Sequence, residues 1–366
     1  MVNKKKYGKW IWLILLPIAI LLVRGASANS GFVETYYSRG IYLFIGQVLS
    51  SVFGIFPFSF GELIVIFFIG FIIYRVIRLI INIITIKSTA KYYEIVYFIR
   101  DIVVYISVGY FIFICIWGLN YHRLPFSEIA ALSIQKASVD ELTNLCESLI
   151  IEANELRDDV IEDDEGVMYI PNGYRSVFKR ADIGYKIVSE VYPVLGGKYG
   201  RAKGVIISEA MSYAGITGIY FPFTGEANVN INRPDLLLPA TTCHEIAHQR
   251  GFAREDEANY IAYLVCKMHP DVDYKYSGTM LALIHSMNKL YEYDKDSYSK
   301  LKAKYSKGVR RDLADNNRYW KIYSGPVDRV STKINNAYLK SNLQKDGVHS
   351  YGRMVDLLIA ERRFDK

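Results

Sequence analysis

Hydrophobic positions in the first third of the chain form long uninterrupted stretches, not a pattern that alternates with polar residues. They lie between Lys9 and Arg24, from about residue 60 to 84, and from 102 to 119. A helix of about 20 apolar residues can cross a bilayer. We therefore expect three transmembrane helices, at about 10–23, 60–84 and 102–119.

The first of these stretches has two interpretations. Only 14 uncharged residues separate Lys9 from Arg24, a length that also suits the core of a cleaved signal peptide. We favour an uncleaved span, because Trp10 and Trp12 can lie at the membrane interface and Lys9 can extend to the headgroups.

Between the first two stretches, residues 40–58 are apolar but are interrupted by Gly46, Gly54 and Pro57. This pattern favours a helix near 40–56 that lies on the outer membrane surface. A poor fourth span is the alternative, and it would invert the topology of everything that follows.

The cations predict an orientation. Lysines cluster before the first span, and Arg75, Arg78, Lys87, Lys91 and Arg100 lie between the second and the third. Because positive loops stay in the cytoplasm, we expect a cytoplasmic N-terminus and an extracytoplasmic C-terminal domain. The chain then divides into a membrane region, 1–123, and an external domain, 124–366.

The external domain combines helices with a few strands, and helices dominate. Ser138 and Glu141 form a capping box that opens an amphipathic helix. A second helix is predicted over 176–192, and the pattern after residue 274 is mostly helical. Strand-like segments occupy 204–208 and 218–232, the latter with a turn at Thr224 and Gly225. The fold class is therefore α+β, mainly helical with a small sheet.

Composition and charge exclude several classes of protein. The chain of 366 residues is 51% hydrophobic and 22% charged, which excludes a disordered protein. Its net charge of +7 resembles that of a nucleic-acid-binding protein, but residues 1–123 hold 12 Lys/Arg against 4 Asp/Glu, and the remainder holds 32 against 33. The excess thus belongs to the apolar third, so the lipid bilayer is the expected partner and nucleic acid is not.

The chemistry is concentrated in the segment HEIAHQRGFAREDEAN, which begins with the pattern HExxH at His244, Glu245 and His248. Two histidines four residues apart lie on one face of a helix, so both can bind one Zn²⁺ while Glu245 acts as base on a water. Asp235 can cap this helix, which is predicted over about 236–250 and ends at Gly251.

A catalytic zinc needs a third protein ligand, and the next helix begins with three acids. Glu255 is four residues before Asn259, which could orient a ligand through a hydrogen bond. Glu257 instead falls in register with the apolar stripe of its helix, and so Glu255 is preferred and Glu257 is the alternate. One zinc ion per chain is expected. A third histidine on the HExxHxxGxxH pattern is excluded, because that position holds Arg254.

HEIAHQRG followed by EDEANYIAYL resembles the gluzincin metallopeptidases, in which a downstream glutamate completes the zinc site. The whole chain also resembles a family of bacterial membrane proteins classed as a domain of unknown function. The first resemblance implies a zincin-like domain with His244, His248 and Glu255 as ligands and Glu245 as base. It covers about 20 residues, and only six residues separate His248 from Glu255, fewer than is usual in gluzincins.

These observations predict a membrane-anchored zinc metalloendopeptidase that cleaves a peptide or protein substrate. Tyr351 and His349 are candidates to stabilise the oxyanion by residue type alone. The alternative is a membrane-anchored binding or structural protein with a non-catalytic zinc site, in which Cys243, Cys266 or His269 supplies a fourth ligand. Arg233, Arg250 and Arg254 flank the motif and argue against a site inside the bilayer.

Overall fold

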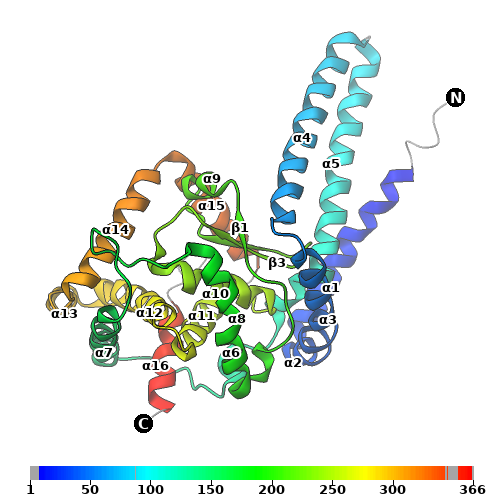
Figure 1. The fold of residues 1–366 in the computed structure, drawn as a ribbon. Helices are drawn as coiled ribbons and strands as arrows, with labels where there is room; N and C mark the ends of the chain where they lie inside the picture. The colour runs from blue at the N-terminus through cyan, green and yellow to red at the C-terminus, as the bar shows by residue number, and fades with distance from the viewer. Residues whose placement is uncertain (1–7, 87, 343, 345–352, 365–366) are drawn as a thin grey trace.

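The computed structural model describes residues 8–86, 88–342, 344 and 353–364. Helices make up most of these residues, and a small three-stranded sheet accompanies them (Figure 1). The predicted fold class, mainly helical with a small sheet, is confirmed at this level.

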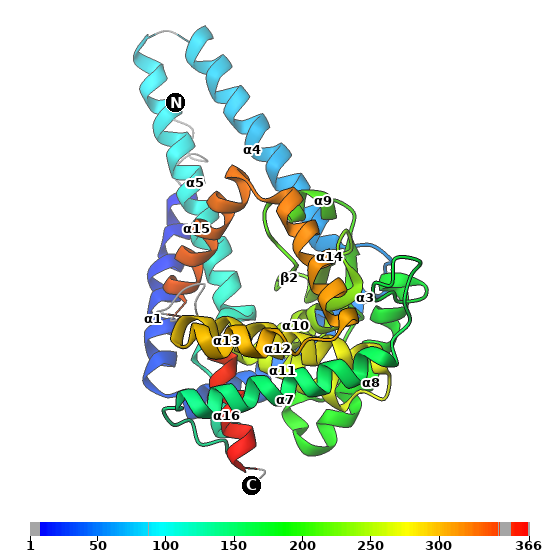
Figure 2. The same cartoon turned by 90° about the vertical axis from the view of Figure 1, so that its left-hand side faces the viewer.

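Three helices are long and apolar enough to cross a membrane, over residues Lys9–Ala28, Phe60–Thr85 and Lys91–Ile116. They correspond to the 3-10 turn η2 (Gly8–Ile14) with α1 (Leu15–Ala28), to α4 (Phe60–Thr85) and to α5 (Ser88–Ile116). The hairpin of α4 and α5 projects away from the rest of the molecule (Figures 1 and 2). The third span begins earlier than its predicted start at 102, and it includes Arg100 and Asp101, which pair with each other. The side of the membrane on which each end lies stays a prediction.

A short helical segment follows α1 and leads to the predicted interfacial helix. It comprises α2 (Ser30–Phe32), the π-helix η3 (Val33–Ile41) and α3 (Tyr42–Gly54). One face of α3 packs on the main domain through buried Tyr42, Gly46 and Ser50. The opposite face is apolar and open, and Phe44 is 70% exposed. A helix is present where the sequence predicts it, with one face packed on protein and an exposed apolar face opposite; its position at a membrane surface stays a prediction.

The main domain is built around α10 (Leu238–Gln249), α11 (Glu255–Met268) and α12 (Val272–Tyr293), which pack against one another. Their apolar side chains form one large core together with helices that precede and follow them. The remaining helices and turns of the domain are η4 (Gly118–His122), α6 (Phe126–Ile129), α7 (Val139–Asp158), α8 (Gly173–Val191), η5 (Pro193–Leu195), α9 (Ser208–Tyr213), η6 (Asp235–Leu237), α13 (Lys295–Lys302), α14 (Lys307–Tyr323), α15 (Pro326–Ser341) and α16 (Met354–Phe364).

Several local predictions are confirmed. The capping box of Ser138 and Glu141 opens α7, with both reciprocal hydrogen bonds formed. Helix α8 occupies the segment predicted as the second helix. The helix of the HExxH motif ends where Gly251 adopts a positive φ of 83°. All four cysteines are free thiols, and Cys146, Cys243 and Cys266 are buried.

One predicted helix cap is wrong. Asp235 does not cap the HExxH helix, because its carboxylate accepts a hydrogen bond from the backbone amide of Ile170, at 2.8 Å. A 3-10 turn, η6, precedes α10 instead, and Pro239 lies in the first turn of α10, where its missing amide proton is not needed. Asp235 therefore ties two loops together.

The sheet has the order β1-β3-β2, with β1 (Lys203–Val205), β2 (Gly218–Phe221) and β3 (Glu226–Asn230). Strand β3 is central and buried throughout; β1 runs parallel to it and β2 antiparallel. The predicted turn at Thr224 and Gly225 connects β2 to β3, and Gly225 has a φ of 66°. Among the described strands, β2 is therefore an edge, and it packs along α10.

Residues of the N-terminal region cap the C-terminal end of α10, where backbone carbonyls have no partner within the helix. The indole of Trp117 donates to the carbonyl of His248, at 3.1 Å, and the hydroxyl of Tyr42 donates to that of Gln249, at 2.7 Å. Arg123 donates to the carbonyl of Gly251, at 3.0 Å. The N-terminal region and the main domain are thus joined directly at the HExxH motif.

Arg123 also forms a buried two-pronged ion pair with Glu34, at 2.8 and 2.9 Å. We expect Arg123→Met to destabilise the protein by about 3–5 kcal/mol, because it leaves Glu34 buried without a partner. The thermal unfolding midpoint of the detergent-solubilised full chain measures this. Arg363→Met, which breaks a more exposed pair with Glu141, is the control, and an equal shift in both variants contradicts the prediction.

Candidate metal centre

Helix α10 places the three residues of the HExxH motif in the interior of the domain. His244, Glu245 and His248 are all buried, and the neighbouring helices α8, α11 and α12 surround α10. Since residues four apart share a face of a helix, both imidazoles point the same way. The hydrophobic packing of the remaining faces of α10 fixes this direction.

Helix α11 brings a carboxylate to the two imidazoles. Oε2 of Glu255 lies 3.2 Å from Nε2 of His244 and 3.5 Å from Nε2 of His248, and the two Nε2 atoms are 3.0 Å apart. A tetrahedral zinc with bonds of about 2.0–2.1 Å separates its ligand atoms by roughly 3.3 Å. Among the residues that the structure describes, these three form the one His/Cys/Asp/Glu group with the geometry of a metal site.

The short connection between His248 and Glu255 is made by a tight turn. The amide of Gly251 donates to the carbonyl of His248, and that of Phe252 donates to the carbonyl of Ala247. A Cβ atom at Gly251 would lie 2.7 Å from the ring of Tyr42. Glycine is thus required at position 251 both by its φ and by the close approach of Tyr42. The six-residue connection is long enough to bring Glu255 to the two histidines.

The same turn orients one of the ligands. Nδ1 of His248 lies 2.7 Å from the carbonyl oxygen of Phe252, an acceptor that holds the proton on Nδ1. Nε2 of His248 is therefore the ring nitrogen that faces Glu255 and His244. Hydrogen bonds of this kind fix the orientation and tautomer of metal-binding histidines.

The two other acids at the start of α11 are directed elsewhere. Glu257 accepts from the backbone amide of Phe126, at 2.9 Å, and from Arg254, at 2.8 Å. Asp256 pairs with Arg353, at 3.4 Å. Of the two predicted third ligands, Glu255 and not Glu257 lies with the histidines.

Burial and charge shift the acidities of these groups. Burial disfavours the charged form of both Glu255 and His248, but their mutual attraction outweighs it. The pKa of Glu255 is held well below its usual range, and the carboxylates of Glu255 and Glu245 raise the pKa of His248 to about 9. A proton therefore occupies this cluster at neutral pH in the metal-free protein.

Glu245 projects from α10 to the edge strand β2. The backbone amide of Tyr220 donates to its carboxylate, and burial raises its pKa. Its Oε2 atom is buried and has no partner among the described residues. A Cβ atom at Gly218 would lie 2.5 Å from Oε1, so the strand can approach this closely only because residue 218 is glycine. Glu245 is thus held between the imidazoles and the strand.

A family model described as "Protein of unknown function (DUF3810)" matches residues 37–359. The match covers most of the chain, from η3 to α16. The chain belongs to this family. The matched region includes α4, α5 and the candidate metal centre. No curated protein and no solved structure matches the chain.

His269, one of the residues considered as a fourth ligand, lies outside the group formed by His244, His248 and Glu255. Asn259 is buried on α11, one turn after Glu255. Tyr351 and His349 lie outside the described residues. His269 stacks on Tyr274 and contacts the carbonyl of Arg180.

The two cysteines considered as a fourth ligand also lie elsewhere. Cys243 and Cys266 are buried side by side in the core and hydrogen-bond to each other. Neither belongs to the group formed by the two histidines and Glu255.

Several residues near the centre are not evident from the sequence. Tyr338 on α15 accepts a hydrogen bond from Tyr121 at 3.1 Å. Burial raises the pKa of Tyr338, the hydrogen bond from Tyr121 lowers it, and the nearby Glu255 carboxylate raises it. His285 on α12 lies near His244, and burial lowers its pKa to about 4. Because these contacts join α12 and α15 to α10 and α11, no local pattern reveals them.

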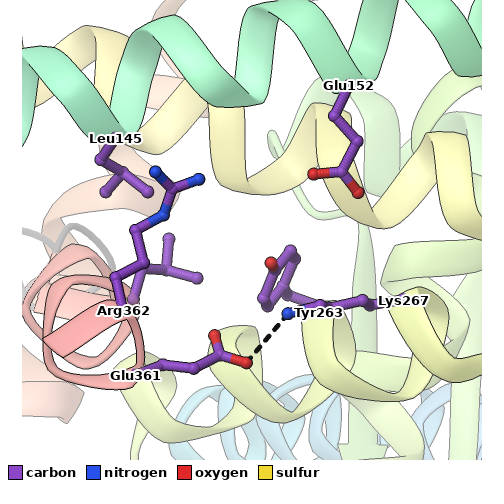
Figure 3. A pocket seen from close by; sticks show the side chains of 7 residues that line it. Leu145, Glu152, Tyr263, Lys267, Glu361 and Arg362 are labelled. Atoms are coloured by element: carbon purple, nitrogen blue, oxygen red, sulfur yellow. Dashed lines mark hydrogen bonds and ion pairs between the residues drawn. The ribbon is translucent and has the colours of Figure 1, made fainter. Parts of the chain in front are cut away.

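A separate cavity of about 250 Å³ lies between α7, α11 and α16 (Figure 3). Its walls include Glu152, Tyr263, Arg362 and the ion pair of Lys267 with Glu361, at 3.1 Å. Tyr263 and Lys267 lie two and three turns after Glu255 on α11. The cavity is therefore distinct from the metal centre.

The ligand set predicts a contrast between two matched variants. We expect purified wild-type protein to hold about one zinc ion per chain, Glu255→Gln to lose most of it, and Glu257→Gln to retain it. A glutamine side chain at position 257 can still accept from the amide of Phe126, so this control preserves the local fold. Elemental mass spectrometry measures the metal, and equal zinc in both variants contradicts the assignment.

The raised pKa of His248 predicts how metal binding depends on pH. Zinc binds the neutral imidazole, but below about pH 9 the metal-free protein carries a proton on His248. Binding at pH 7 therefore releases about one proton, and affinity weakens about tenfold per pH unit as the pH falls from 8 to 6. Calorimetry in buffers of different ionisation enthalpy measures the release; a pH-independent affinity contradicts it.

Proposed function

We propose that this protein is a membrane-anchored zinc metallopeptidase of the gluzincin type. The observation that carries the proposal is the convergence of His244, His248 and Glu255 with a fourth group, Glu245, beside an edge strand. Three protein ligands leave one position of a tetrahedral ion open, as catalytic zinc sites require. A structural site would need a fourth protein ligand, and the described residues supply none.

A bound zinc would acidify a water and polarise the carbonyl of a peptide bond. Glu245 accepts the proton of this water and then transfers it to the leaving amine. Its buried position favours the first transfer, because burial raises the pKa of the carboxylate and so stabilises its protonated form. The backbone amide of Tyr220 holds the carboxylate in place.

Strand β2 provides a surface for an extended peptide. It pairs with β3 through one edge, and the amide of Tyr220 points away from β3 towards Glu245. A peptide that lies along the outer edge can pair with the backbone of β2 and pass its scissile bond over α10. The edge strand thus serves both to bind substrate and to position the base.

The three apolar helices support the membrane anchor, since they are long enough to cross a bilayer. Their attachment to α10 through Trp117 and Tyr42 favours an active full-length protein. An endopeptidase that acts on exported or membrane polypeptides is consistent with this arrangement.

The proposal predicts two distinguishable losses of activity. We expect Glu245→Gln to abolish cleavage of a mixed synthetic peptide pool, and Gly218→Ala to reduce it by about 10²-fold because the added methyl displaces Glu245. Both variants should retain about one zinc ion per chain. Mass spectrometry of the peptide products measures cleavage by the full chain in detergent. If Glu245→Gln with bound zinc cleaves at the wild-type rate, the mechanism is wrong, and a non-catalytic zinc site becomes the better interpretation.

A further inference from the structure

Arg233 lies in the loop between β3 and α10 and reaches the face of α10 that carries the metal ligands. Its Nη1 atom donates to the hydroxyl of Thr241, at 2.6 Å. Thr241 is three residues before His244 and four before Glu245, so all three share one side of the helix. The guanidinium therefore lies about one helical turn from the metal ligands.

This guanidinium is a buried cation without an ion-pair partner. Arg233 is only 9% exposed, its Nε atom is buried with no hydrogen-bond partner, and no described carboxylate oxygen lies within 4 Å of it. Glu245 and Asp235 are close enough to attract it at longer range. Asp235, however, is engaged by the amide of Ile170.

A buried charge that lacks a partner is costly, so its retention calls for an anion that pairs with it. Burial lowers the pKa of Arg233 to about 10, and the group is still a cation at neutral pH. Guanidinium groups bind carboxylates through parallel hydrogen bonds. The unpartnered Nε atom is one of the donors that such a contact uses.

The distance from Arg233 to the candidate metal ligands determines how far from the scissile bond this carboxylate would lie in a substrate. One helical turn advances about 5.4 Å, whereas an extended peptide advances about 3.3–3.6 Å per residue. A carboxylate one or two residues from the scissile bond therefore matches the distance from the metal ligands to Arg233. Both a free C-terminus and an acidic side chain supply this group.

We propose that Arg233 binds a substrate carboxylate one or two residues from the scissile bond and so selects peptides that carry one. The inference rests on the proposed peptidase function. The group that Arg233 would bind is a carboxylate. The experiments below distinguish its two possible sources, a free C-terminus and an acidic side chain.

The test uses full-length zinc-loaded protein in detergent and two synthetic pools of short peptides with randomised residues. The pools are identical except that one ends in a free carboxylate and the other in an amide. We expect wild type to cleave the acid pool 10- to 100-fold faster, and Arg233→Gln to reduce that ratio to about one. Arg318→Gln, an exposed arginine on α14, is the matched control and should keep the preference.

A second pair of pools, both amidated, differs in holding Glu or Gln at one fixed internal position. Preference within the first pair alone identifies a C-terminal carboxylate as the ligand, and preference within the second pair identifies an acidic side chain. Equal cleavage within both pairs overturns the inference about Arg233 while the peptidase function stands.

Binding provides a readout that does not require cleavage. Equilibrium dialysis of the acid and amide pools against zinc-loaded Glu245→Gln protein should show at least tenfold tighter binding of the acid pool. The Arg233→Gln, Glu245→Gln double variant should lose this difference, and Arg233→Lys should keep part of it. Acid-selective binding without any cleavage by wild type refutes the peptidase function but supports the carboxylate site. The same dialysis is done with the internal Glu and Gln pools, and equal or absent binding within both pairs of pools refutes the carboxylate site.

Discussion

The capped end of α10 is the constraint on which the rest of the structure depends. A helix leaves its last carbonyls without partners, and in this protein Trp117, Tyr42 and Arg123 satisfy them from the N-terminal region. His248 lies in this last turn, and its ring is oriented by the carbonyl of Phe252, two residues after Arg250. The candidate metal centre therefore derives its geometry from contacts with the segments that lead to and from the apolar helices.

Local signals in the sequence predict much of this molecule. The capping box at Ser138, the stop at Gly251 and the apolar stretches each depend on neighbouring residues. The structure has all of these elements, although the third apolar helix begins earlier than the pattern predicts. The pairing of Glu255 with the two histidines also follows from a short loop, since only six residues intervene. Such features can be predicted from the sequence because only a few conformations of a short segment are compatible with its residues.

Other features depend on residues far apart in the chain, and for this reason they could not be predicted. Trp117 and His248 are separated by 131 residues, and no periodicity connects them. Asp235 has the residue type and position of a helix cap, yet the amide of Ile170 competes for its carboxylate and prevails. The approach of Gly218 to Glu245, and the burial of Arg233, arise only when the sheet and α10 are assembled.

The two faces of α3 bear on the distance between the candidate metal centre and the membrane. An enzyme that is joined to its anchor by a flexible linker samples a wide range of heights, set by the length of the linker. Here the inner face of α3 holds α10 through Tyr42, and its outer apolar face is open beside the apolar helices. If those helices lie in a bilayer, the candidate metal centre is held at a fixed distance from the membrane surface. If the protein has the proposed peptidase activity, the position at which it cleaves a membrane-bound substrate is then determined by the distance of that position from the membrane as well as by the substrate sequence.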